Sequence, residues 1–149
     1  MAQQKEIIST LNSLIETLKD GQEGFRQAAG AVKDPQLKSL FEQYSLQRSR
    51  FVGELQTEAR SFGESDPEKT SSAAGAMHRA WINIKSAITS GDVHAILAEC
   101  ERGEDSAVNE YKKAMEDELA APLRDIISRQ YSEIKSAHDR VKQLRDATK

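Results

Sequence analysis

Apolar residues recur three and four positions apart along four long stretches of the chain, which is the pattern of amphipathic α-helices. These stretches cover residues 4–32, 35–62, 93–119 and 122–146. Two prolines stand at the junctions between stretches, since Pro35 follows Asp34 and Pro122 follows Ala121. Proline suits the first turn of a helix, and aspartate suits the N-cap. The sequence therefore predicts an all-α protein built from long helices.

The connections between these helices differ in length, and the difference predicts the topology. The short connections at Asp34 and Ala121 require antiparallel helical hairpins. Residues 63–92 form a long connection that contains a short helix, which we expect at about residues 72–89. A crossover of this length can return along the bundle, as in ferritin-like four-helix bundles. We therefore expect one domain over residues 1–149: a ferritin-like antiparallel bundle of two hairpins joined by a crossover.

Composition and charge narrow the class of protein. Charged residues make up 30% of the 149 residues and aromatic residues 5%, as expected for amphipathic helices. The formal net charge of −3 gives no basic footprint for nucleic acid. No apolar run reaches the roughly 20 residues that span a bilayer, and the N-terminal residues lack signal-peptide features. We therefore expect a cytoplasmic protein, with its one cysteine, Cys100, in the core.

Polar residues interrupt the apolar stripes near the middle of the predicted bundle. Glu101 and Glu104 lie between apolar residues of the stretch Ile96–Tyr111, where carboxylates are costly unless they are paired or bind a cation. Three glutamines also fall on or near the stripes: Gln22, Gln47 and Gln130. We expect these glutamines to form a polar layer at mid-bundle, with Gln22 opposite Gln47.

Five short segments carry a family resemblance. They are Asp20–Phe25 (DGQEGF), His78–Trp81 (HRAW), Ile96–Asp105 (ILAECERGED), Gln130–Tyr131 (QY) and His138–Val141 (HDRV). With them the chain resembles a bacterial family of four-helix-bundle proteins that is classed as a domain of unknown function in the ferritin-like superfamily. The resemblance implies a ferritin-like bundle with a crossover and supplies no established activity.

The ligand pattern of a ferritin-like di-iron centre is incomplete here. Such a centre uses two Glu-x-x-His pairs, which place a carboxylate and an imidazole one helical turn apart. No such pair occurs, since the residues three positions before His78, His94 and His138 are Gly75, Gly91 and Lys135. A reduced site for Fe, Mn or Zn remains open, with these ligands: Glu101, Glu104, His138 and Glu23. The alternative is that the glutamates pair with Arg102, Arg140 or Lys135 along the helix edges and that His138 donates to a carboxylate.

Two functions follow from these patterns. The first is a non-enzymatic structural or interaction protein, acting as a homodimer; a role in a stress response is compatible with it. The second is a metal-binding protein or weak oxidase with a degenerate site in the bundle core. The missing Glu-x-x-His pair, and the lack of any nucleophile–base arrangement, incline us against an enzyme. We expect no nucleic-acid or membrane partner.

Overall fold

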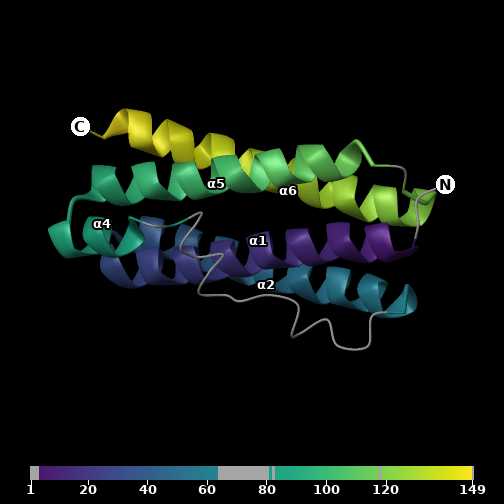
Figure 1. Ribbon diagram of the computed structural model, residues 1–149. Helices are drawn as coiled ribbons and strands as arrows, with labels where there is room; N and C mark the ends of the chain where they lie inside the picture. The colour runs from purple at the N-terminus through teal and green to yellow at the C-terminus, as the bar shows by residue number, and fades with distance from the viewer. Residues whose placement is uncertain (1–3, 64–80, 82, 118, 149) are drawn as a thin grey trace.

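The computed structural model describes residues 4–63, 81, 83–117 and 119–148 (Figure 1). These residues form five helices, which are α1 (Gln4–Ala31), α2 (Pro35–Ser61), α4 (Ile84–Ser90), α5 (Val93–Met115) and α6 (Ala121–Ala147). No strand occurs within these ranges, so the prediction of an all-α chain is confirmed. The first part of the predicted crossover helix, together with His78, lies outside the described residues, and its last part is α4.

The four long helices pack into an elongated bundle (Figure 1). Helices α1 and α2 lie side by side along their lengths, and so do α5 and α6. Helix α1 also packs along α5, α2 contacts α6, and α4 lies against α5 and α1. The N-terminal end of α1 and the α5–α6 connection share one end of the bundle, whereas α4 lies at the other end. Among the described helices, none is long and apolar enough to cross a membrane.

The helix ends follow local sequence chemistry. Asp34 Oδ1 accepts a hydrogen bond from the Gln36 N–H at 2.9 Å, and Asp92 Oδ1 accepts one from the His94 N–H at 3.0 Å. Gly91 ends α4 in the left-handed conformation, with φ of 69°. Aspartate favours the N-cap and glycine the left-handed C-terminal cap, so the sequence predicts caps at Asp34, Asp92 and Gly91. All three are confirmed. Helix α5 ends at Met115, whereas the sequence predicted an end at residue 119. A longer helix would place acidic residues in its last turn, where the negative end of the helix dipole would repel them.

The apolar core is divided into two clusters. One fills the half of the bundle that contains the start of α1, and its members include Leu11, Ile15, Leu18, Phe51, Leu55, Val108, Tyr111, Leu123, Ile127 and Ile134. The other fills the half beside α4, and its members include Phe25, Val32, Phe41, Trp81, Ile84, Ile96, Leu97, Cys100 and Val141. Arg48 and Glu104 are buried between the two clusters, at the level where the sequence predicted a polar layer.

Trp81, at the end of the crossover, is wedged between α1 and α5. Its side chain is 2% exposed and stands edge-on to Phe25, with ring centroids 5.2 Å apart. A Cβ placed on Gly24 of α1 would lie 2.4 Å from the indole, and one on Gly103 of α5 would lie 2.3 Å from it. Glycine at both positions therefore makes room for the ring. A tryptophan in the crossover segment predicts, from the sequence, that this segment packs onto the bundle, and the burial of Trp81 confirms it.

The packing of Trp81 against glycine predicts that alanine substitutions at two glycines in the interiors of long helices change stability in opposite directions. We expect Gly103→Ala to lower the free energy of unfolding by about 1–3 kcal/mol, because the new methyl group overpacks the rigid indole. Gly53→Ala is the matched control, since a Cβ on Gly53 meets no atom within 4 Å. There the better helix propensity of alanine raises stability by up to about 1 kcal/mol. Urea unfolding of both variants makes the comparison; a neutral Gly103→Ala variant would contradict the steric explanation.

Candidate functional site

A buried ion pair joins α2 to α5 at the centre of the bundle. Arg48 is 1% exposed and Glu104 is fully buried. Arg48 Nη1 donates to Glu104 Oε1 at 2.5 Å, and Nη2 donates to Oε2 at 2.7 Å. Both carboxylate oxygens are therefore engaged by one guanidinium in a bidentate contact. Burial lowers the pKa of Arg48, but the adjacent Glu104 carboxylate more than offsets this effect, so that the pKa is raised overall.

The residues around Arg48 complete its environment. The guanidinium carbon lies 5.4 Å from the centroid of the Phe25 ring, within the range of a cation–π contact. Arg48 Nε donates to Gln47 Oε1 at 3.1 Å. A Cβ on Gly21 would lie 3.3 Å from Arg48 Nη1, so the glycine leaves the arginine the space that it needs. The ion pair is thus held by a specific set of neighbours between the two apolar clusters.

Cys100 lies in the same region and is fully buried, as expected for a core residue. Burial raises the pKa of its thiol well above the usual value, and the nearby carboxylates of Glu104 and Glu99 raise it further. The thiol is therefore held in its protonated form, which is a poor nucleophile and a poor metal ligand.

The structure does not bring the four predicted metal ligands together. Glu104 has both oxygens on Arg48, and Glu23 lies on the outer side of α1, where it forms an ion pair with Arg26. The hydrogen bond from Arg26 lowers the pKa of Glu23. Glu101 and His138 do lie close together, at the edge of the bundle between α5 and α6. The donor set at the core does not fit a metal centre, because a guanidinium already supplies the positive charge there.

Two of the three predicted glutamines, Gln47 and Gln130, have side-chain hydrogen bonds to different partners. Gln47 accepts from Arg48, as above, whereas the side chain of Gln22 is half-buried. Gln130 is fully buried, accepts a hydrogen bond from the Tyr111 hydroxyl at 2.6 Å and donates one to Glu54 Oε1 at 2.9 Å. Burial raises the pKa of Tyr111, which keeps its hydroxyl a donor. The polar groups at mid-bundle are therefore two networks, one at Arg48 and one at Gln130, instead of a single glutamine layer.

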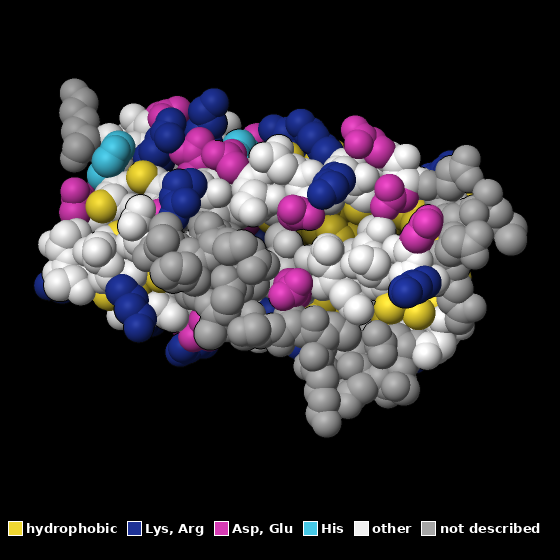
Figure 2. Space-filling model, viewed as in Figure 1, with side chains coloured by type: hydrophobic (Ala, Val, Ile, Leu, Met, Phe, Trp, Pro, Cys, Tyr) yellow, Lys and Arg dark blue, Asp and Glu magenta, His cyan; other side chains and the backbone are white. Residues whose placement is uncertain are grey.

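A cluster of possible ligand atoms lies where α5 faces α6. One side-chain atom each from Glu101, Asp105 and His138 lie within 4.8 Å of one another. The distance from His138 Nε2 to Asp105 Oδ1 is 2.5 Å, and the distance from His138 Nδ1 to Asp139 Oδ1 is 3.0 Å. Glu101 also forms an ion pair with Arg145. In Figure 2, histidine side chains lie among acidic and basic ones toward the end of the molecule where α6 terminates.

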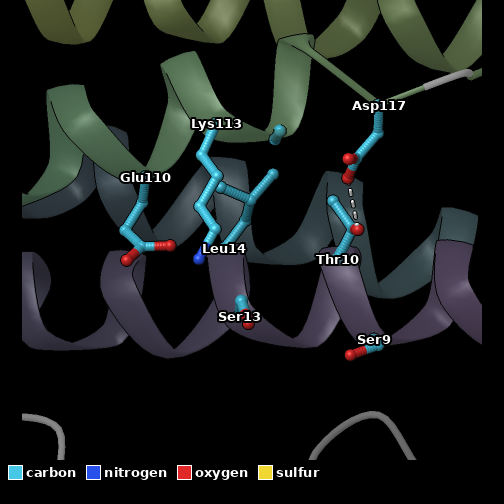
Figure 3. Close-up of a pocket in the computed structure, with 8 residues that line it drawn as sticks. Ser9, Thr10, Ser13, Leu14, Glu110, Lys113 and Asp117 are labelled. Atoms are coloured by element: carbon cyan, nitrogen blue, oxygen red, sulfur yellow. Dashed lines mark hydrogen bonds between the residues drawn. The ribbon is translucent and has the colours of Figure 1, made fainter.

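A small polar cleft lies elsewhere, between the first half of α1 and the last half of α5 (Figure 3). Its volume is about 180 Å³, and its lining comprises Ser9, Thr10, Ser13, Leu14, Glu110, Lys113, Ala114 and Asp117. Thr10 Oγ1 donates to Asp117 Oδ2 at 2.8 Å across one end of the cleft. The lining combines hydroxyl groups with charges of both signs, so it is compatible with many small polar molecules and favours none.

Sequence reasoning missed Arg48 and Asp105, although both carry a signal. The apolar positions Leu37, Phe41 and Phe51 of α2 extend at spacings of three and four to residue 48. The stripe therefore points inward at Arg48 and not at Gln47, but a charged residue is rarely assigned to a core. Asp105 stands four residues after Glu101, on the same face of α5.

The fold and these sites define an all-α helical-bundle protein with a buried ion pair at its centre. The chain belongs to a family described as a domain of unknown function (DUF2383), which matches residues 6–117. The matched region includes α1, α2, α4 and α5 and ends before α6. The prediction of a family of unknown function is thus confirmed. No curated protein matches the chain.

The buried pair makes a prediction about stability. Glu104→Leu leaves a charged guanidinium in the core, and Arg48→Met leaves a carboxylate there, so we expect each to cost about 3–5 kcal/mol. The double variant removes both charges, and we expect it to cost far less than the sum. Chemical denaturation of the four proteins completes the cycle. Glu23→Gln, which breaks an exposed pair, is the control and should cost less than about 1 kcal/mol. Additive single effects would contradict the pairing.

Proposed function

We propose that this protein is a ferritin-like four-helix-bundle protein that acts as a homodimer through its surface, without catalysis in its core. The long connection between α2 and α5 supports the ferritin-like frame, because a crossover of this kind joins the two hairpins of such bundles. The Arg48–Glu104 pair supports a non-catalytic core. It places an arginine, which does not exchange protons near neutral pH, in the bundle core, where ferritin-like di-iron proteins hold their metal ligands.

The observation that carries the dimer is a stripe on the outer face of α2. Glu42, Leu46 and Arg50 are all exposed and lie one helical turn apart, so that an acid, an apolar residue and a base follow one another. Leu46 is 58% exposed, more than any other large apolar residue in the described chain. It borders a groove of about 330 Å³ between α1 and α2.

This stripe is complementary to itself. In a two-fold symmetric dimer, residue i of one copy contacts residue j of the other, and j contacts i. If two α2 helices cross antiparallel at Leu46, each Glu42 faces Arg50 of the second copy, and the two leucines pack together. A second copy of this chain is therefore complementary to the stripe in charge, with an apolar contact at its centre.

A charge swap tests this dimer. We expect Glu42→Arg to weaken dimerisation by about tenfold or more, because the symmetry axis repeats the new repulsion twice. Adding Arg50→Glu restores opposite charges across the interface and with them the dimer. The measurement is molar mass by light scattering and sedimentation over a range of protein concentrations.

The second exposed large apolar residue in the described part of the chain, Val93, supplies the control. We expect Leu46→Glu to give a monomer and Val93→Glu, at a residue that is 38% exposed on α5, to leave the dimer intact. A wild-type protein that is monomeric at every concentration would overturn the proposal. So would a dimer that is indifferent to both the swap and Leu46→Glu.

A further inference from the structure

We propose that Glu101, Asp105 and His138 form a binding site for a divalent transition-metal ion, with Zn²⁺ as its strongest occupant. The site lies at the outer edge of the α5–α6 pair and is separate from the bundle core and from the α2 stripe. It therefore goes beyond the proposed function and does not depend on it.

The helices place the three ligand atoms at a suitable separation. Glu101 and Asp105 are four residues apart on α5, so both side chains project from one face toward α6, where His138 stands. The three ligand atoms lie within 4.8 Å of one another. A tetrahedral ion bound at about 2.0–2.2 Å from each ligand keeps them roughly 3.4 Å apart. Metal binding therefore requires side-chain rotations that lengthen the contact between His138 and Asp105 from 2.5 Å.

The contacts of His138 point independently to a positive charge. Carboxylate oxygens lie against both ring nitrogens, Asp105 at Nε2 and Asp139 at Nδ1. Carboxylates of Glu101, Asp105 and Asp139 thus surround one imidazole, and this local excess of negative charge favours a bound cation.

The surroundings favour the metal ion. Asp139 accepts from Nδ1, which directs Nε2 toward the carboxylates; most zinc-bound histidines have an outer partner of this kind. Lys135 Nζ holds Asp139 in place at 2.8 Å, and this lysine hydrogen bond is the main reason why the pKa of Asp139 is lowered. One imidazole and two carboxylates form a mixed nitrogen and oxygen donor set, which suits Zn²⁺ and its neighbours in the first transition row. Three protein ligands also leave a position for water.

Arg145 is the competitor of the metal ion. It pairs with Glu101 and so neutralises one of the three ligands. It also pairs with Asp146 at 2.7 Å, so it keeps a partner when a metal ion displaces it from Glu101. This predicts that removing Arg145 strengthens metal binding, whereas removing an ordinary supporting residue would weaken it.

Calorimetric titration with Zn²⁺, and the visible spectrum after Co²⁺ addition, test the site in the full chain purified without a metal-chelating tag. We expect one ion per chain. His138→Gln should lose binding, and Asp139→Asn should weaken it by about 10–100-fold. His94→Gln is the matched control: His94 lies on α5 and is half-buried like His138, but its Nδ1 faces the Thr148 hydroxyl at 2.8 Å. Its loss should leave binding unchanged.

Arg145→Gln should not weaken Zn²⁺ binding. We expect its affinity for Zn²⁺ to be several-fold higher than that of the wild type. Far-ultraviolet circular dichroism of each variant confirms that the helices are formed. Unchanged Zn²⁺ binding in folded His138→Gln, or equal loss in His94→Gln, would overturn the site. A wild-type protein that does not bind Zn²⁺ at micromolar concentrations would also overturn it.

Discussion

The burial of a guanidinium and a carboxylate at the centre of the bundle is the constraint on which the surrounding structure depends. Each charge alone would cost several kcal/mol to remove from water, and only close, bidentate pairing offsets that cost. Arg48 and Glu104 therefore fix the position of α2 relative to α5, since sliding either helix by one turn would separate them. Hydrophobic contacts within the two apolar clusters would tolerate such a shift more readily, because they lack direction. We infer that the pair sets the register of the bundle.

This arrangement also bears on where the molecule can interact with other species. The centre of the bundle offers no free charge to a ligand. Both guanidinium nitrogens that face Glu104 are hydrogen-bonded to its carboxylate, and aromatic and glycine residues fill the space beside Arg48. The less constrained polar groups lie outside: at the α5–α6 edge, in the cleft between α1 and α5, and along the outer face of α2. Recognition at these places requires no rearrangement of the core. The two proposals, the α2 dimer and the edge site, use different helices and so are independent.

The helices could be predicted from the sequence because their signals are local. Spacing of apolar residues, Asp34 and Asp92 as N-caps, and Gly91 as a C-terminal cap each act within a few residues. The polar residues at the centre were harder to predict, because neighbouring positions such as Gln47 and Arg48 differ by about 100° around a helix. Which of the two faces the core depends on how α2 packs on the other helices. Likewise, nothing local indicates that Glu104 meets an arginine 56 residues earlier. In contrast, Glu101 and His138 could be named together as candidate ligands. The short connection between α5 and α6 sets which residues of these two antiparallel helices lie at the same level.

Trp81 has a consequence for observing this molecule. It is the chain's single tryptophan, and its indole lies between α1 and α5, against two glycines and the edge of Phe25. The fluorescence of the protein therefore comes from one place, and its wavelength and intensity depend on how closely those helices enclose the ring. Any process that separates α1 from α5, or withdraws the crossover, would be visible as a red shift without an attached dye. The bundle thus contains its own optical reporter of core closure.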